Sequence, residues 1–226
     1  MVNDFISLLF PRCCVISDVP LAKGERFIAT SAALALPRFD LYHPLEVLMQ
    51  RMYTFAPVKH TFAYYKFAKR SRVQRLLHQL KYKNYPEVGE LAGMWFGHAL
   101  TDAGYQDAFD LIIPIPLHHT RQRQRGYNQS DYIAKGISKA MNIPWNANVL
   151  ARPQRTTTQT RKSRWERSSN VEDAFRLLCP TCIANQQILL VDDVLTTGAT
   201  LGAGANTLLS GGAATVSVAA LAGLEY

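Results

Sequence analysis

Residues 188–200 read ILLVDDVLTTGAT, which places an apolar run, two acids and a turn of small residues in consecutive order. The four aliphatic residues from Ile188 to Val191 are typical of a parallel strand that is covered on both faces. We expect this strand to end where Asp192 and Asp193 begin, because paired carboxylates are not buried without partners. The stretch therefore predicts two acids at the carboxyl end of a buried strand.

The residues after the acids have the composition of a phosphate-binding turn. Thr196, Thr197 and Thr200 offer hydroxyl groups, and Gly198 can adopt a positive φ. A helix is expected over 201–209, and backbone amides at a helix N-terminus attract phosphate groups. The order of strand, acids and turn indicates a site for a sugar phosphate. The alternative is a purely structural tight turn, since acids commonly follow strands in doubly wound sheets.

As a whole, residues 188–200 resemble the fingerprint of the type I phosphoribosyltransferases, in which Asp-Asp-x-x-Thr-Thr-Gly-x-Thr follows a hydrophobic run. The resemblance implies binding of 5-phosphoribosyl-1-diphosphate. It implies that Asp192 and Asp193 hold the ribose 2- and 3-hydroxyls. The implied 5-phosphate cradle and its neighbours are Val194, Thr196, Thr197, Gly198, Ala199 and Thr200.

Further motifs resemble those of the ComF group, also called GntX-like, within the phosphoribosyltransferases. They are the stretches 78–82 (HQLKY), 114–118 (PIPLH) and 125–129 (RGYNQ), and then the spaced residues Gln159, Arg164, Arg167, Asn170 and Phe175. This resemblance implies that the turn at 114–117 faces the diphosphate and that a mobile loop around 159–167 closes over the reacting centre. The implied catalytic residues are Asp192, Asp193 and, in the loop, Arg164. The implied substrate-binding residues are Lys81, Pro116, Leu117, Arg125 and Gln159. Mg²⁺ is expected to be held mainly through the donor diphosphate, without a direct protein ligand.

The pattern of strands and helices predicts an α/β fold with a twisted parallel sheet flanked by helices. Strands are expected over 59–67, 110–116 and 214–221, and helices over 70–82, 86–100 and 130–141. Their alternation indicates βαβ units. In such sheets ligands bind at the carboxyl ends of the strands. We expect a phosphoribosyltransferase-like domain over 58–226, with a long polar loop over 152–173, after a separate region over 1–57.

The net charge of +8 is unevenly distributed. Residues 47–86 contain no acid, and a second basic tract includes Arg121, Arg123, Arg125 and Arg152. Such surfaces attract polyanions, either a diphosphate-bearing small molecule or single-stranded DNA. The aromatic residues Phe62, Tyr64 and Tyr65 could stack on bases, but their place on a predicted strand favours the core.

The amino-terminal region departs from the ComF group, whose members typically begin with paired Cys-x-x-Cys motifs that resemble a zinc site. Here Cys13 and Cys14 remain, and the region is interpreted as a degenerate finger. A closed zinc site needs four ligands, so we expect Cys179 and Cys182 to be free thiols, with a metal site shared between the two cysteine pairs as the alternative. The cysteine content, the acid at Asp4 and the absence of a long apolar stretch favour the cytoplasm and no membrane span.

Two functions follow as hypotheses. The first is a phosphoribosyltransferase that transfers the sugar to or from a nitrogen nucleophile. The second is a protein of DNA uptake and competence that binds single-stranded DNA on its basic tracts, with little or no transferase activity. The related glutamine amidotransferases need an amino-terminal nucleophilic cysteine, and residue two is Val2, so a glutaminase activity is not expected.

Overall fold

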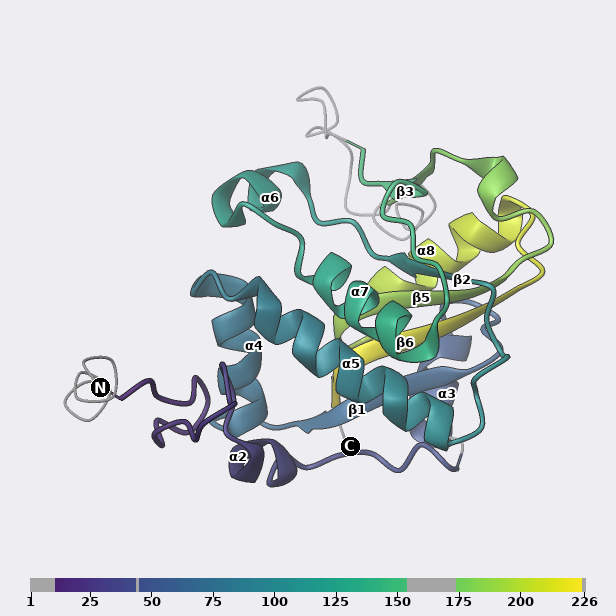
Figure 1. The fold of residues 1–226 in the computed structure, drawn as a ribbon. Coiled ribbons are helices and arrows are strands. Elements are labelled where there is room, and N and C mark those ends of the chain that lie inside the picture. The colour runs from purple at the N-terminus through teal and green to yellow at the C-terminus, as the bar shows by residue number, and fades with distance from the viewer. Residues whose placement is uncertain (1–10, 44, 154–173, 225–226) are drawn as a thin grey trace.

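A four-stranded parallel sheet forms the centre of the protein in the computed structural model, which describes residues 11–43, 45–153 and 174–224 (Figure 1). Its strands are β1 (Thr61–Phe67), β2 (Leu111–Pro114), β5 (Gln187–Leu195) and β6 (Thr215–Leu224), in the order β1-β6-β5-β2. In β5, Val191 pairs with Pro114 on one side and with Ala219 on the other. The predicted parallel sheet flanked by helices is confirmed.

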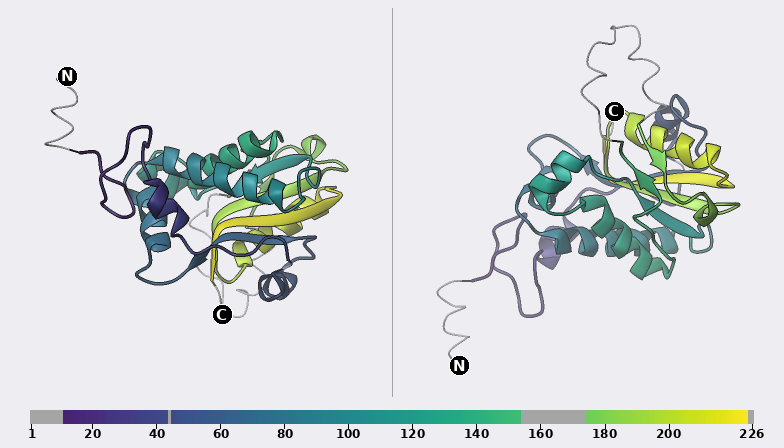
Figure 2. Two further views of the ribbon diagram at one scale, coloured as in Figure 1. Left: turned by 60° about the horizontal axis from the view of Figure 1, so that its bottom comes forward. Right: turned by 90° about the horizontal axis from the view of Figure 1, so that it is seen from above.

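Helices cover both faces of this sheet (Figure 2). One face carries α4 (Arg72–Tyr82), α5 (Pro86–Asp102) and α7 (Gln129–Met141), and the other carries α3 (Glu46–Tyr53) and α8 (Ala199–Ser210). In β5 the side chains of Leu189 and Val191 pack toward the first face, and those of Ile188 and Leu190 toward the second. The apolar run is therefore buried on both faces, as its composition predicted.

Helices α5 and α7 pack against each other at very close range. A Cβ atom at Gly136 of α7 would lie 2.1 Å from the carbonyl oxygen of Glu90 and 2.7 Å from the amide nitrogen of Met94, both on α5. Only a glycine fits where the two backbones approach in this way. Helix α7 also contacts β5 and β2, and its first residues reach the carboxyl ends of these strands.

The amino-terminal residues in the described part share the core of the sheet. Cys14 and Ile16 are buried in the same apolar cluster as β1, and α2 (Thr30–Leu34) adds Ala32 and Ala33 to it. The division at residue 57 stays a prediction. Phe62, Tyr64 and Tyr65 are also buried in this cluster. Their assignment to the core is confirmed, and they offer no stacking face to nucleic acid.

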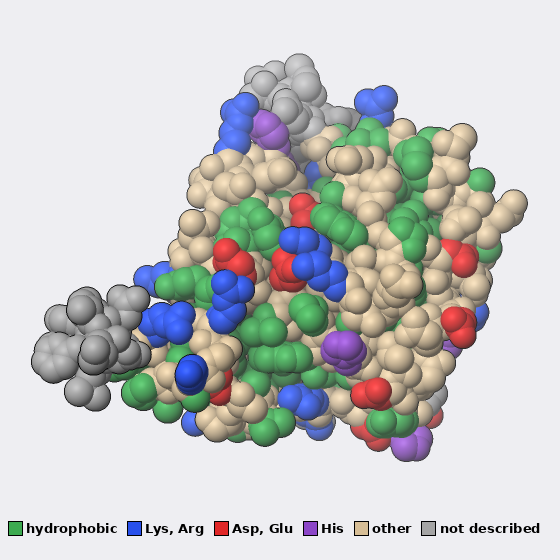
Figure 3. All heavy atoms as spheres, in the orientation of Figure 1, with side chains coloured by type: hydrophobic (Ala, Val, Ile, Leu, Met, Phe, Trp, Pro, Cys, Tyr) green, Lys and Arg blue, Asp and Glu red, His purple; other side chains and the backbone are tan. Residues whose placement is uncertain are grey.

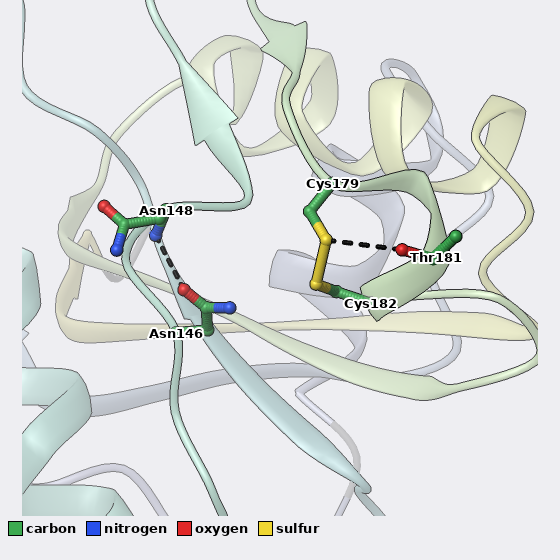
Figure 4. Close-up of a disulfide and its surroundings, with 5 residues drawn as sticks. All are labelled: Asn146, Asn148, Cys179, Thr181 and Cys182. Carbon is green, nitrogen blue, oxygen red and sulfur yellow. Dashed lines mark hydrogen bonds between the residues drawn. A yellow bond between two sulfur atoms is a disulfide. The ribbon is translucent and has the colours of Figure 1, made fainter.

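The expectation that Cys179 and Cys182 are free thiols is wrong, because they form a disulfide (Figure 4). Cys179 precedes the short 3₁₀ helix η3 (Pro180–Cys182) and Cys182 is its last residue, which brings their Cα atoms to 5.4 Å, within the usual range for a disulfide. Cys13 and Cys14 are free thiols. Among the described residues, no group of three or more His, Cys, Asp or Glu side chains is arranged to hold a metal ion.

The remaining elements are short. Helix α6 (His119–Arg125) follows β2, and β3 (Leu150–Ala151) pairs with β4 (Arg176–Leu177) in a separate antiparallel ladder. Within the described ranges, none of the helices has the length and apolar character that crossing a membrane requires.

Candidate functional site

The two acids lie inside β5 and not beyond its end, which corrects the predicted strand boundary. The strand continues to Leu195, and Asp193 is only 6% exposed. The prediction assumed that a carboxylate pair without partners must leave the strand. The structure supplies partners from α4 and α7, so the strand passes through both acids.

Asp193 is held by two side chains that come from different helices. The Lys81 Nζ atom on α4 lies 3.0 Å from Asp193 Oδ1, and the Gln129 Nε2 atom on α7 donates a hydrogen bond of 2.7 Å to Asp193 Oδ2. Gln129 is fixed in turn, because Arg125 donates a hydrogen bond of 2.6 Å to its Oε1 atom. Both oxygens of Asp193 therefore have a partner, and the carboxylate is braced between α4 and α7.

Asp192 has a different environment. Its Oδ1 atom accepts hydrogen bonds from the Ser130 hydroxyl, at 3.0 Å, and from the backbone amide of Asp193, at 2.8 Å. Burial, together with the charge of the neighbouring Asp193 carboxylate, raises the pKa of Asp192 to about 7, although the two hydrogen bonds and Lys81 oppose the shift. A carboxyl group that changes charge near neutral pH, next to one that is ion-paired, is typical of a functional site.

The start of α7 links these acids to the end of β2. Asn128 caps the helix by accepting a hydrogen bond from the amide of Ser130, and its Nδ2 atom donates to the carbonyl oxygen of Ile115, at 3.0 Å. The amide of Ile115 donates in turn to the carbonyl oxygen of Val191 in β5, at 2.8 Å. The turn after β2 is thereby tied to the strand that carries the acids.

The turn from Thr196 to Thr200 lies directly after the acids, as predicted. Gly198 adopts φ +95° and precedes the first residue of α8, so a residue with a side chain would be strained there. Thr196, Thr197 and Thr200 are exposed, and Arg51 of α3 donates a hydrogen bond of 2.8 Å to the carbonyl oxygen of Thr196. This arrangement presents exposed hydroxyl groups at the N-terminus of a helix, beside a guanidinium group.

Arg152 brings a second guanidinium group to this edge of the sheet. Its Nε atom donates a hydrogen bond of 2.9 Å to the carbonyl oxygen of Pro116, and its guanidinium carbon lies 4.8 Å from the centre of the Phe175 ring. Burial lowers the pKa of Arg152, and the charge of Asp192 counteracts that shift. A cation therefore lies within electrostatic range of the acids.

Most of the predicted site residues in the described part lie around this strand end. Lys81 contacts Asp193 directly, Arg125 reaches it through Gln129, and Pro116 is bonded to Arg152. Val194 is half-buried against the core, and Leu117 is half-buried after the turn. Gln159 and Arg164 lie outside the described residues, so their roles stay predictions.

Sequence reasoning missed Gln129, Ser130, Arg51 and Arg152 as site residues. Gln129 belongs to the RGYNQ motif and Ser130 follows it directly, so the motif was a usable signal for both. Arg152 was assigned to the second basic tract and to the start of a polar loop, and nothing in the local sequence separates Arg152 or Arg51 from the other cations of their basic tracts.

Comparison with known proteins gives several relatives of the chain. It is 37% identical over 147 residues to DNA utilization protein YhgH of Shigella flexneri, a match that covers 63% of each chain. It is 41% identical over 93 residues to competence protein F of Haemophilus influenzae, covering 41% of each, and 34% identical over 116 residues to competence protein ComFC of Bacillus subtilis, covering 50% of this chain and 44% of that one. Each match spans less than two thirds of the relative. No protein-family model matches the chain.

Two solved structures align with the fold at low similarity. One is the allosteric regulatory enzyme of purine biosynthesis, with a TM-score of 0.44 and 17% identity over 62% of this chain and 29% of that one. The other is the glutamine phosphoribosylpyrophosphate amidotransferase of B. subtilis, with a TM-score of 0.44 and 19% identity over 62% of this chain and 30% of that one. On the sequence relatives, the resemblance to the ComF group is confirmed: the chain is a homologue of the YhgH and ComF-type competence proteins.

Proposed function

We propose that the carboxyl end of β5 binds 5-phosphoribosyl-1-diphosphate together with Mg²⁺ and that the protein is a phosphoribosyltransferase. The observation that carries the proposal is that a pair of held carboxylates and a glycine turn at a helix N-terminus follow one another at the same end of β5. Asp192 and Asp193 are held by side chains from α4 and α7, and the Gly198 turn at the N-terminus of α8 follows them directly. Carboxylates suit sugar hydroxyls, and a helix N-terminus suits a phosphate.

Each part of the site has a role in this proposal. The amides and hydroxyls of residues 196–200 receive the 5-phosphate, with Arg51 at the rim of the turn. Asp192 accepts a hydrogen bond from a ribose hydroxyl, and the braced Asp193 holds the neighbouring position. Arg152, at the turn after β2, supplies positive charge for the diphosphate.

The donor set at the site is compatible with Mg²⁺ held largely by its substrate. No cluster of three acidic or histidine ligands occurs in the described part of the chain, and Mg²⁺ is commonly bound by one or two carboxylates together with substrate phosphates. Asp192 would face the ion from the protein side, because both oxygens of Asp193 are already bound by Lys81 and Gln129, and the ion would neutralise charge on the departing diphosphate.

In the reaction, the bond between ribose C1 and the diphosphate breaks as the bond to a nitrogen nucleophile forms. Negative charge accumulates on the leaving diphosphate, and preorganised cations lower the barrier because they need no reorientation at the moment of reaction. Arg152 is preorganised in this sense, since its Nε atom is bonded to Pro116 and its guanidinium group lies against Phe175.

Isothermal titration of the full chain with 5-phosphoribosyl-1-diphosphate tests the proposal. We expect saturable binding with Mg²⁺, much weaker binding with EDTA, and no comparable binding of inorganic diphosphate without the sugar. A screen of nitrogen bases for diphosphate release then tests transfer. Absence of sugar-phosphate binding in the folded protein, at millimolar ligand with Mg²⁺, would overturn the proposed function.

A second candidate function is binding of single-stranded DNA, which the names of the relatives favour. The basic surface remains available for it: Arg121 and Arg123 of α6 are exposed, and Figure 3 shows basic side chains standing out over this helix at the upper left. The buried strand aromatics cannot stack on bases, but Tyr82 is 65% exposed, and the Arg125 guanidinium lies 5.2 Å from its ring centre. Stacking on aromatic rings beside cations is typical of single-strand binding.

An oligonucleotide titration separates the two candidates. DNA binding predicts an affinity that falls steeply with salt and a several-fold loss in Tyr82→Ala. The matched control is Tyr53→Ala, because Tyr53 is 55% exposed on α3, on the other face of the sheet. Oligonucleotide affinity that neither salt nor Tyr82→Ala changes would count against this second candidate.

A further inference from the structure

The disulfide between Cys179 and Cys182 closes a very short loop whose shape does not depend on the bond. The two cysteines are three positions apart in sequence, and the turn between them is held by its own backbone hydrogen bonds. The amide of Cys182 donates to the carbonyl oxygen of Cys179, and the amide of Ile183 donates to that of Pro180, each at 3.2 Å. The two thiols of the reduced protein would therefore stay close to each other.

The chain on both sides of the turn is anchored without help from the disulfide. Before the turn, the amide of Leu178 donates to the carbonyl oxygen of Val149, at 2.8 Å. After it, Ile183 is fully buried, and the amide of Asn185 donates to the carbonyl oxygen of Gly212, at 2.9 Å. Cleavage of the disulfide therefore leaves the path of the backbone in place.

The environments of the two sulfur atoms differ. Cys182 packs against the apolar cluster that contains Ile183 and α8, whereas Cys179 is half-buried between the exposed residues Leu178 and Pro180. The Thr181 hydroxyl lies 3.6 Å from the Cys179 sulfur, as Figure 4 shows, and can donate a hydrogen bond to it as a thiolate. Both cysteines are half-buried, and we expect an incoming thiol to attack Cys179, which has exposed neighbours on both sides.

We propose that Cys179 and Cys182 are a reversible dithiol–disulfide couple that exchanges with thiols such as glutathione. In reduction, a thiolate attacks the Cys179 sulfur, the bond to Cys182 breaks, and Cys182 leaves as a thiolate that takes up a proton. A second thiolate then attacks the mixed disulfide at the sulfur of the first thiol. Cys179 is released as a thiol, and the two external thiols end as one disulfide. The protein gains two electrons and two protons, and the reverse sequence restores its disulfide.

The remaining cysteines cannot replace this couple. Cys14 is only 1% exposed, in the core near β1, and Cys13 lies next to it as a free thiol in the amino-terminal region. The Cys179 turn precedes β5, far from both in the fold. A thiol count can therefore be assigned to one pair or the other by the peptide that carries the label.

The test uses the full chain equilibrated in glutathione buffers of graded ratio, quenched with iodoacetamide and analysed by peptide mass. We expect labels at Cys179 and Cys182 to appear together with a two-electron dependence on the buffer, to disappear on reoxidation, and to leave the circular dichroism spectrum unchanged. Cys182→Ser should trap one glutathione on Cys179, and a Cys13→Ser, Cys14→Ser variant should titrate like the unmodified protein.

Two results would overturn the proposal. If the pair becomes labelled only after the protein is unfolded, the disulfide is a fixed structural bond. If the reduced and folded protein does not re-form the bond in glutathione disulfide, the two cysteines are not a couple. Neither result depends on whether the protein binds a sugar phosphate.

Discussion

The two ends of β5 differ in the range of their contacts. At the carboxyl end, Asp193 is bound by Lys81 and Gln129, which lie on different helices far away in the sequence. At the amino end, the Cys179 turn is shaped mainly by hydrogen bonds between residues three positions apart. The first end exists only when the whole fold has assembled, whereas the second is largely a local structure.

This difference has consequences for energetics and for chemistry. At the carboxyl end, the pKa of Asp192 depends on its burial, on the charge of Asp193 and on Lys81. A change in any of these groups should therefore alter the charge of Asp192. A local turn can change its covalent state without disturbing the sheet. We therefore expect large effects from changes at the carboxyl end and small effects at the amino end.

The largest expected effect is that of Lys81→Met, which leaves Asp193 buried without its cation. The side chain of Asp193 is 8% exposed, so the variant should lose about 3 kcal/mol of its free energy of unfolding in urea. The matched control is Lys135→Met, because Lys135 makes a 2.8 Å ion pair with Glu90 of α5, which also pairs with Lys139 and so keeps a cation; this variant should cost less than about 1 kcal/mol. Equal losses of unfolding free energy in the two variants would show that the Lys81–Asp193 ion pair stabilises the protein no more than the Lys135–Glu90 pair does.

Gly136→Ala should have the next largest effect. The new methyl group would meet the backbone of Glu90 and Met94 at distances that force α5 and α7 apart, at a cost of about 1–3 kcal/mol. Separation of the helices should also displace Gln129 and Ser130 from the acids. Urea unfolding measures the cost, and an unchanged stability would mean that the helices are not as tightly packed as described.

The pH dependence of stability should identify Asp192 as a titrating group. Its pKa in the folded protein, about 7, lies above its ordinary value, so between about pH 4 and pH 7 the folded chain holds a proton that the unfolded chain has lost. The stability from this group is present in acid and is lost as pH rises through 7. Asn cannot titrate, so Asp192→Asn should gain roughly 1 kcal/mol or more over the unmodified protein between pH 5 and pH 8.

Asp131 titrates in the same direction, because burial raises its pKa to about 6. Its contribution is common to both proteins and cancels in the difference between Asp192→Asn and the unmodified chain. If the difference in unfolding free energy between Asp192→Asn and the unmodified protein is constant from pH 5 to pH 8, Asp192 does not titrate in this range.

The smallest expected effect is reduction of the disulfide. The bond closes one turn that its backbone hydrogen bonds already hold, so reduction should cost less than about 1 kcal/mol, below the 2–4 kcal/mol typical of disulfides. Urea unfolding with and without reductant measures this cost. A loss as large as that in Lys81→Met would remove the contrast between the two ends of β5.

The same contrast explains what could be predicted from the sequence. The run from Ile188 to Val191 and the Gly198 turn are local patterns, and both were placed correctly. The end of the strand was placed too early. The partners that allow Asp193 to be buried lie on α4 and α7, and the local sequence around Asp193 does not contain them. Cys179 and Cys182 were considered as free thiols or metal ligands, because the sequence alone does not show whether two nearby cysteines form a disulfide.

Titration of Asp192→Asn with 5-phosphoribosyl-1-diphosphate and Mg²⁺ tests most directly whether the carboxyl end of β5 is a sugar-phosphate site. Charge-assisted hydrogen bonds contribute roughly 1.5–3 kcal/mol, so this variant should bind at least about tenfold more weakly than the unmodified protein. The control is Asp131→Asn. Asp131 is a half-buried carboxylate two positions beyond Gln129, and its partner is Asn128 and not either of the two acids. We expect this control variant to bind the sugar phosphate with nearly unchanged affinity. Equal affinity of Asp192→Asn and the unmodified protein, with both folded, would contradict the assignment of this strand end to the sugar.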